Sequence, residues 1–270
     1  MQIQVHSWNV NVFRSSQEAM SRKIDLLRAA SVGQGIFCLQ ECDEKFYSEL
    51  IRTRVFDWSV SSLQLRDRGK FDGRNRHLGC VVAGFLPFYP ARFSLLAETP
   101  LPERNLVVEL AHDDARFAVA SFHSLTGVSY KQAKVINFQM TADWLDRRRL
   151  PTVMCIDANT PRVDRPELAE SEWWWKEEPI LFGAERQHDL QDAFRQDLAK
   201  NPEELKAIVA ERPDGPLAIS HLRGSQNVPS RYDFVYVSPE WTVVNAQYRF
   251  EEAVDHGGDH ALVSADLTLG

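Results

Sequence analysis

The sequence predicts an α/β fold in which two β-sheets pack together and helices flank them. Two observations favour this fold class: strand-like runs outnumber helix-like runs, and both types alternate along the 270 residues without an internal repeat or low-complexity linker. We therefore expect a single domain over residues 1–270. A long loop breaks the rhythm at about 160–188, and long loops of this kind often carry function.

The strand predictions come from apolar runs that are β-branched or alternate with polar residues and are bounded by turn residues. In the first half of the chain they cover 2–8, 35–40, 56–63, 78–85, 92–98, 105–111 and 116–123. In the second half they cover 152–157, 232–238, 242–250 and 261–269. So many strands beside so few helices favour two packed sheets.

The helix predictions come from apolar residues that recur at helical spacing. One helix spans 15–31, with Ser15 and Glu18 as a capping box, and another spans 129–149. A further helix spans 201–209, with Asn201 as its cap before Pro202. The apolar faces are Met20, Ile24, Leu27 and Ala30 in the first helix, and Val135, Phe138, Ala142 and Leu145 in the second.

Composition and charge indicate a globular protein without a membrane-spanning segment. The chain is 44% hydrophobic and 26% charged, which is typical of a globular protein. Its formal net charge of -7 argues against a protein that binds nucleic acid through an overall positive charge. Binding through a local basic groove or a bridging divalent metal remains open. Because the chain opens on a strand pattern and has no apolar stretch of membrane-spanning length, we expect no signal peptide, no membrane contact and a cytoplasmic location.

The cysteines fit the same expectation. Their spacing contains no C-x-x-C pair that would suggest zinc, and most of them lie in apolar strand-like runs. We expect Cys38, Cys42, Cys80 and Cys155 to be free thiols, mostly buried, in a reducing compartment.

Polar side chains recur where the predicted strands end. Taken singly, an Asn at such a position is usually a turn residue, and a His there usually forms a hydrogen bond with the backbone. Together they supply a carboxylate–amide metal site, two imidazoles and two further carboxylates. The positions are Asn9, Gln40 with Glu41, His123, Asp157 with Asn159, Asp233, and Asp259 with His260.

In these motifs the sequence resembles the endonuclease/exonuclease/phosphatase superfamily, which includes deoxyribonuclease I-like nucleases. The resemblance covers nearly the whole chain in the family's order, and its last three motifs are the most specific. It implies a four-layer sandwich of two mixed β-sheets with flanking helices, and an active site at one edge of the paired sheets. The motifs are WNVN (8–11), LQE (39–41), SFHS (121–124), IDAN (156–159), RYDFVYV (231–237) and GDHALV (258–263).

Two departures from the family pattern leave the reacting side chains in place: Ile156 stands where the family usually has glycine, and Gly258 where it has serine. The family's Asp-His pair directly precedes the final strand, so the resemblance assigns that pair to Asp259 and His260. The nearby pair 255–256 is then a loop neighbour. The glycines at 257–258 also disfavour a helical zinc site built from both histidines.

The resemblance implies metal-dependent phosphodiester hydrolysis with Mg²⁺ or Mn²⁺ as cofactor. Oxygen ligands suit these ions, and we expect Glu41, Asn9 and Asp259 to hold the metal.

The same resemblance assigns the groups that act on the phosphate. His260 is the candidate general base and Asp233 its orienting carboxylate. Asp157 positions or deprotonates the attacking water, so either it or His260 takes the proton. Asn159 donates a hydrogen bond to a phosphate oxygen.

The role of His123 depends on a missing partner. Deoxyribonuclease I-like members pair this histidine with an acid just before a central strand, whereas the corresponding stretch here, 73–80, contains no acid. Phosphate binding is therefore favoured over proton donation for His123. We also expect Asn11, Arg76 and Arg104 to contact substrate, and Arg74, Arg162 and Arg165 are further loop arginines that offer bidentate contacts or remain solvated.

The run Trp173–Trp175 has two interpretations. One or two of the rings form a stacking platform for bases or sugars, or the run tucks the loop onto the body of the protein; the second interpretation is slightly favoured.

The leading hypothesis is a nuclease with nucleic acid as its partner, DNA somewhat more than RNA. The alternative is a phosphatase or phosphodiesterase acting on a small phosphorylated molecule, a nucleotide or a phosphoinositide, which the acidic net charge favours slightly. A catalytically inactive binding protein is the third hypothesis, and it is disfavoured because no core position of the motifs is lost.

Overall fold

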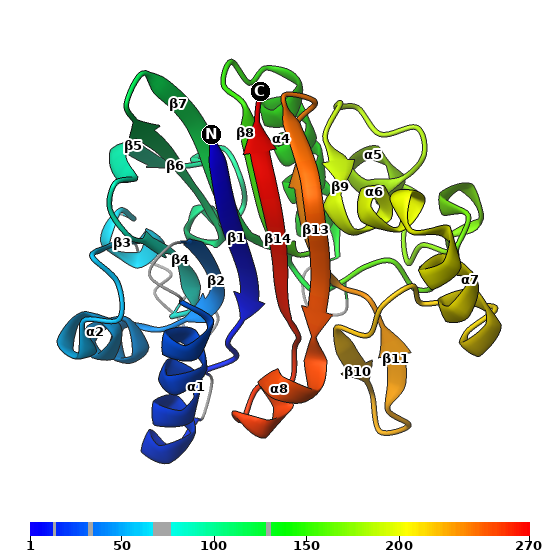
Figure 1. The fold of residues 1–270 in the computed structure, drawn as a ribbon, viewed down its shortest axis with the longest axis horizontal. Helices are drawn as coiled ribbons and strands as arrows, with labels where there is room; N and C mark the ends of the chain where they lie inside the picture. Colours follow the sequence, from blue (N-terminus) through cyan, green and yellow to red (C-terminus); the bar gives the residue numbers. More distant parts are fainter. Residues whose placement is uncertain (13–14, 32–34, 67–76, 128–130) are drawn as a thin grey trace.

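A computed structural model describes residues 1–12, 15–31, 35–66, 77–127 and 131–270. They form two mixed six-stranded sheets and a small hairpin (Figure 1). The first sheet has the order β13 (Trp241–Arg249), β14 (Leu262–Leu269), β1 (Gln2–Asn9), β2 (Ile36–Cys42), β4 (Gly79–Gly84), β3 (Trp58–Ser61). The second has the order β5 (Tyr89–Leu95), β6 (Asn105–His112), β7 (Ala115–His123), β8 (Thr152–Asp157), β12 (Asp233–Val237), β9 (Gln191–Asp192).

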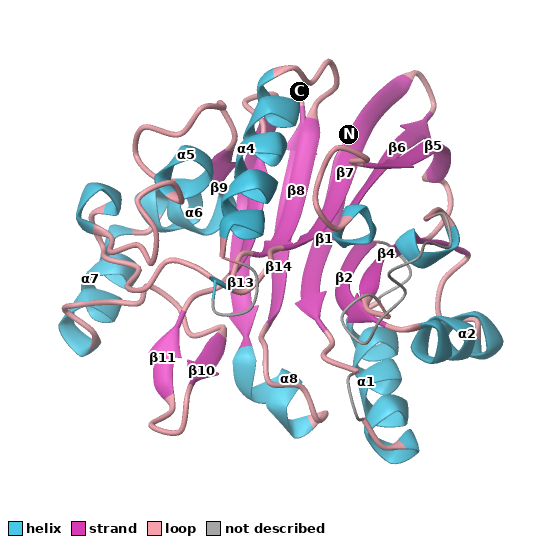
Figure 2. Cartoon of the chain, turned by 180° about the vertical axis from the view of Figure 1, so that it is seen from behind, coloured by secondary structure: helices cyan, strands magenta, loops and turns pink. Residues whose placement is uncertain are grey.

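Helices cover the outer faces of both sheets and complete a four-layer sandwich. The first sheet packs under α1 (Gln17–Ala30), α2 (Glu44–Thr53) and α8 (Phe250–Asp255). The second packs under α4 (Gln132–Asp146) and α5 (Pro179–Phe182), and α4 runs alongside β8 in Figure 2. At the β12–β13 side, α6 (Ala193–Lys200) packs against both sheets and continues into α7 (Pro202–Glu211).

Three apolar cores correspond to these layers. The largest lies between the sheets, where alternate residues of both point inward, for example Val5 and Cys38 from one sheet and Val119 and Cys155 from the other. The second fills the space under α1 and α2, and the third the space under α4 and α5. All four cysteines are buried and free.

The predicted fold class is confirmed, and every predicted strand and helix is present with small changes at its ends. One local prediction is wrong: the cap of α1 is Ser16, whose hydroxyl accepts from the backbone N of Ala19 at 3.1 Å, so Ser15 and Glu18 form no capping box. Asn201 does precede α7, but its side chain bonds to Asp197 and not to the helix.

Several elements were not predicted, namely α2, α5, α6, α8, β9 and the hairpin of β10 (His221–Arg223) and β11 (Val228–Ser230). The long segment 160–188 contains a single 3₁₀ turn at Leu168–Glu170, the helix α5 and an antiparallel bridge between Val163 and Glu172. In the described part of the chain, no helix is long and apolar enough to cross a membrane.

Candidate active site

The predicted strand-end residues converge because of how the strands run. Strands β1 and β2 are parallel, as are β7 and β8, so the carboxyl ends of each pair meet at one sheet edge. Strand β12 runs antiparallel to β8, which places Asp233 directly opposite Asp157. The loop before β14 brings His260 to the same edge, where its backbone forms a bridge with His221 of the hairpin. Side chains far apart in sequence therefore meet in one site.

A buried histidine–carboxylate pair lies at the centre of this site. Nδ1 of His260 is 2.8 Å from Oδ2 of Asp233, and both side chains are buried. Burial alone would lower the pKa of His260, but the charges of Asp233 and Asp157 outweigh it and raise the pKa to about 10. The imidazole is therefore a cation at neutral pH. In this state both ring nitrogens carry a hydrogen and act as hydrogen-bond donors.

The backbone of His260 is held from behind by Trp8, whose indole Nε1 donates to the His260 carbonyl at 3.0 Å. Gly258 leaves space for this indole, since a Cβ there would come within 3.1 Å of Trp8 Cζ2 and 3.0 Å of the Ala253 carbonyl. A side chain at this position would therefore require the indole or the carbonyl to move by a few tenths of an ångström. The neighbouring His256 ends α8, where its Nδ1 donates to the Glu252 carbonyl.

Asp157 is the most heavily hydrogen-bonded carboxylate of the site. Its Oδ2 accepts from Asn9 Nδ2 at 2.8 Å and from Asn159 Nδ2 at 3.3 Å, and its Oδ1 accepts from the Asn159 backbone at 3.0 Å. Burial nevertheless raises the pKa of Asp157, and the negative charges of Asp233 and Glu41 act in the same direction. Asp157 is therefore both fixed in position and more basic than an exposed carboxylate.

Glu41 reaches the site through an unusual backbone conformation. Its φ of 55° lies in the left-handed region, which side chains other than Gly, Asn and Asp rarely adopt. The pairing of β2 with β4 is irregular between Leu39 and Cys42, so a bulge turns the carboxylate toward His123 and away from the ladder. Oε1 of Glu41 is 3.3 Å from Nε2 of His123. Backbone strain of this kind is concentrated at functional sites.

His123 is paired with a cation. Nη1 of Arg104 lies 3.0 Å from Nδ1 and 3.3 Å from Nε2 of the ring, and both residues are buried. Burial lowers the pKa of His123, and the positive charges of Arg104 and His260 lower it further, so the imidazole is neutral. Arg104 belongs to a 3₁₀ turn, Pro102–Arg104, and its side chain is buried, which rules out the solvated alternative; its expected contact with substrate stays a prediction.

Asn11 and Asp259 form a second hydrogen-bonded pair, with Asn11 Nδ2 donating to Asp259 Oδ2 at 2.8 Å. The backbone N of Asn11 donates to Asn9 Oδ1, and the buried Lys23 donates to the Asn11 carbonyl at 2.9 Å. Of the other arginines, Arg165 is paired with Glu172 and Asp214, while Arg162 lies over the ring of Trp174. Arg74 and Arg76 lie outside the described residues.

The donor set of this edge fits a hard divalent cation. Glu41 Oε1, His123 and Asp157 place ligand atoms within 4.8 Å of one another, whereas Asp259 groups with His221 and His260. Two of the three expected ligands, Glu41 and Asp259, therefore fall in different clusters, and Asn9 lies beside Asp157, to which its amide donates. Burial raises the pKa of Glu41, with Asp259 adding to it against the opposing charges of His260 and Arg104. A bound cation would offset this accumulated negative charge.

Sequence reasoning missed three residues of the site. His221 stacks on His260 with ring centroids 4.4 Å apart, and its Nδ1 donates to the Asp259 carbonyl at 3.0 Å. Lys134 and Glu178 form a fully buried ion pair of 2.8 Å, and Lys134 also donates to the Asn159 carbonyl. A lysine within the apolar face of the second predicted helix was the one signal for this pair.

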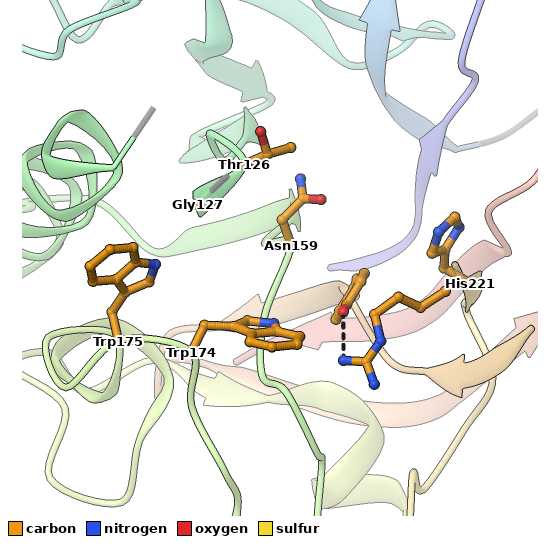
Figure 3. A pocket seen from close by; sticks show the side chains of 8 residues that line it. Thr126, Gly127, Asn159, Trp174, Trp175 and His221 are labelled. Carbon is orange, nitrogen blue, oxygen red and sulfur yellow. Dashed lines mark hydrogen bonds between the residues drawn. The ribbon is translucent and has the colours of Figure 1, made fainter. Parts of the chain in front are cut away.

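The three tryptophans of the run Trp173–Trp175 do not share one environment. Trp173 packs against the core under α4 and α5, as the structural interpretation predicted. Trp174 and Trp175 remain 45% and 38% exposed and line a cavity of about 500 Å³ beside Asn159 (Figure 3).

No protein-family model and no curated protein matches the sequence. Solved structures do match along the whole chain. D. rerio TDP2 complexed with a single-strand DNA product is 13% identical, with a TM-score of 0.66, and the match covers 99% of each chain. The human Nocturnin catalytic domain with bound sulfate is 15% identical (TM-score 0.65; 100% of this chain and 95% of that one). An endonuclease/exonuclease/phosphatase from Beutenbergia cavernae is 19% identical (TM-score 0.60; 100% of this chain and 72% of that one).

Proposed function

We propose that this protein, whose fold is that of the endonuclease/exonuclease/phosphatase superfamily, is a Mg²⁺- or Mn²⁺-dependent phosphodiester hydrolase. We further propose that it is a nuclease with DNA as its preferred substrate. The main support is the buried His260–Asp233 pair, whose ligand atoms lie within 4.8 Å of Asp157. A structure of the same fold, D. rerio TDP2, is complexed with a single-strand DNA product, which supports nucleic acid as substrate.

In this proposal His260 stabilises charge. Its Nδ1 bonds to Asp233, so Nε2–H is the donor left for a non-bridging phosphate oxygen. A pKa of about 10 keeps the ring protonated at neutral pH, when negative charge develops on the phosphoryl oxygens. Asn159 lies beside it, and because its Nδ2 already donates to the Ser124 carbonyl and to Asp157 Oδ2, it would have to give up one of these bonds to donate to the phosphate.

Asp157 is then the group that takes the proton of the attacking water. The water oxygen forms a bond to phosphorus while its proton passes to Asp157. The ester P–O bond breaks, and the leaving oxygen keeps the electron pair and takes up a proton from solvent. Asn9 and Asn159 hold the carboxylate in place through their hydrogen bonds to it.

The remaining residues bind metal and substrate. Glu41, with Asn9 beside it and Asp259 at the neighbouring cluster, would hold the metal ion, which would supply Lewis-acid stabilisation of the phosphate. His123 is held neutral beside Arg104 and contacts phosphate without donating its proton. Asn11 fixes Asp259, and Arg76 and Arg104 are the proposed cationic contacts for the substrate backbone.

One observation favours a second candidate, a phosphatase or phosphodiesterase of small molecules or nucleotides. The cavity of about 500 Å³ beside Asn159 has the size of a small-ligand site. Salt separates the two candidates, because phosphate contacts along a polymer release counterions. A nuclease therefore loses kcat/KM steeply between 50 and 200 mM salt, roughly 10³-fold or more for six or more contacts, and a small-ester hydrolase loses far less.

The test is an assay of product release with Mg²⁺, Mn²⁺ or EDTA on circular and linear DNA, RNA and a panel of small phosphate esters. His260→Ala is the inactive variant, and His256→Ala, from the other Asp-His pair, is its matched control. We expect metal-dependent cleavage of DNA that His260→Ala abolishes and His256→Ala retains. Hydrolysis of small esters alone would favour the second candidate, and full activity of His260→Ala would overturn the proposed site.

A further inference from the structure

A cavity beside the reaction centre has the properties of a ligand site. It measures about 500 Å³ and shares Asn159 and His221 with the site described above. Figure 3 shows Asn159 and the indole of Trp174 on the same wall region of the cavity, with the Asn159 amide directed away from the indole, and with His221 on one side of the cavity and Trp175 on the other. A molecule bound there would therefore lie directly beside the reaction centre.

The walls of the cavity are flat aromatic faces that stay in contact with water. Exposing two neighbouring indoles is unfavourable unless a ligand covers them. Gly127 leaves room for one of them, because a Cβ at this position would lie 2.6 Å from Trp175 Nε1. Tyr232 adds a third ring at the far wall, stacked on His221 with centroids 5.9 Å apart.

A buried network fixes the cavity relative to the reaction centre. Glu178 accepts from the Trp174 backbone at 2.9 Å and from Thr160 at 2.6 Å, and it is paired with Lys134. Lys134 in turn donates to the Asn159 carbonyl at 3.0 Å. One ion pair thus sets the positions of the aromatic floor and of Asn159, which the cavity shares with the reaction centre. Preorganisation of this kind lowers the entropic cost of binding.

Charge at the cavity suits a ligand that carries a phosphate. The guanidinium of Arg223 lies 4.9 Å and that of Arg162 5.7 Å from the centroid of Trp174. Arg223 also donates to the Tyr232 hydroxyl at 3.4 Å (Figure 3). None of the residues that line the cavity is a carboxylate, so a polyol head group would find few hydrogen-bond acceptors there.

We propose that this cavity binds the nucleobase of one unpaired nucleotide whose phosphate lies at Asn159 and His260. The proposal rests on the proposed function and deepens it by naming the substrate class. A base can stack on Trp174 only when its faces are free, so a base inside a duplex is excluded until it leaves the stack. A free nucleotide and an unpaired nucleotide of a single strand share this chemistry.

The first test measures binding without turnover, so it does not depend on the proposed function. Calorimetry in EDTA compares dAMP with deoxyribose 5-phosphate, which lacks the base. We expect dAMP to bind at least about tenfold more tightly, and Trp174→Ala to remove this difference. Trp174→Phe should restore most of it, whereas Tyr89→Ala, which removes an exposed ring on β5, should leave it unchanged. Equal binding of both probes by the native protein would overturn the proposal.

The second test uses turnover with Mg²⁺. Native protein and Trp174→Ala are given the p-nitrophenyl ester of thymidine 5-phosphate, methyl p-nitrophenyl phosphate, and one oligonucleotide as a single strand and as a duplex. We expect Trp174→Ala to raise KM for the nucleotide ester about tenfold or more, to leave the methyl ester within twofold, and to erase a preference for the single strand.

The arms of this test separate the possible failures. An equal loss on both esters, or equal native rates on single strand and duplex, would overturn the cavity proposal. Inactivity of the native protein on every substrate, with dAMP still bound, would instead overturn the proposed function. The ratio of kcat/KM for the ester and the oligonucleotide identifies the source of the base: equal values indicate free nucleotides, and a faster oligonucleotide indicates a strand.

Discussion

Nδ1 of His260 lies 2.8 Å from Oδ2 of Asp233, and neither side chain has more than slight contact with water. This pair sets the charge of the site, because the two carboxylates at 233 and 157 hold the imidazole protonated against the effect of burial. The imidazole of His260 therefore gives up its proton only to a group of comparable basicity. In the proposed mechanism that charge faces the phosphate.

Replacing Asp233 with Asn should remove this effect while keeping the shape of the side chain. Loss of its charge lowers the pKa of His260, so the imidazolium is less populated when the phosphate binds. We expect kcat to fall by about 10²-fold or more with little change in folding. Steady-state kinetics and a thermal melt measure both quantities. A variant that retained native kcat would show that the pair has only a structural role.

Glu41→Gln should weaken metal binding, because an amide has no charge to offset that of the cation. We expect at least a tenfold loss in Mn²⁺ affinity, measured by equilibrium dialysis, and a matching rise in the metal concentration needed for turnover. Glu44→Gln on α2 is the matched control, since Glu44 is exposed and lies three residues further along the chain. Equal Mn²⁺ affinity in both variants would remove Glu41 from the metal site.

The sequence predicted much of this site because its residues lie at strand ends. Alternating patterns located β1, β7, β8 and β12, and polar residues at their ends had to meet once the strands formed sheets. The motif order supplied the prediction that His260, and not His256, belongs to the site, and His260 does lie against Asp233. These signals are local in the sequence or follow a known order of motifs. They can therefore be recognised without knowing how the elements pack.

Other features depend on contacts that no local pattern contains. His221 lies on a three-residue strand and meets the Asp259 carbonyl across 38 residues of sequence. Two residues of β9 are too few to show any periodicity. Arg104 was expected in a loop where it would contact substrate, and only the packing of its 3₁₀ turn against β6 and β7 places it against His123. The helix α2 differs, because Asp43 as its cap and Phe46 with Leu50 at helical spacing were present and overlooked.

The ion pair of Lys134 and Glu178 predicts an asymmetric response to mutation. Lys134→Met leaves Glu178 buried without its partner, and we expect a loss of about 3–5 kcal/mol in the free energy of unfolding. The double variant Lys134→Met with Glu178→Gln should recover part of that loss, because no unpaired charge remains. Urea denaturation measures these values.

The matched control for this ion pair is Lys206→Met, which breaks a pair with Glu203 on the surface of α7. Both side chains there are mostly exposed, so the expected change is at most about 1 kcal/mol. Comparable losses for Lys134→Met and Lys206→Met would show that burial of the Lys134 pair adds nothing to its effect.

Stability in mild acid should depend on His6, which lies buried on β1 far from the proposed reaction. Its Nδ1 bonds to Ser264 at 2.8 Å, and its ring stacks on Phe37. Burial, together with the charge of Arg249, lowers the pKa of His6 from 6.5 to about 3. Below pH 6.5 His6 is protonated in the unfolded chain but stays neutral in the folded protein. The free energy of unfolding therefore falls as the pH falls, by up to about 1.4 kcal/mol per pH unit. His6→Asn should make the pH dependence of the urea-unfolding free energy shallower between pH 6.5 and 5, and the remaining slope comes from other buried histidines such as His123. An unchanged slope in this variant would mean that the folded protein protonates His6 as readily as the unfolded chain does.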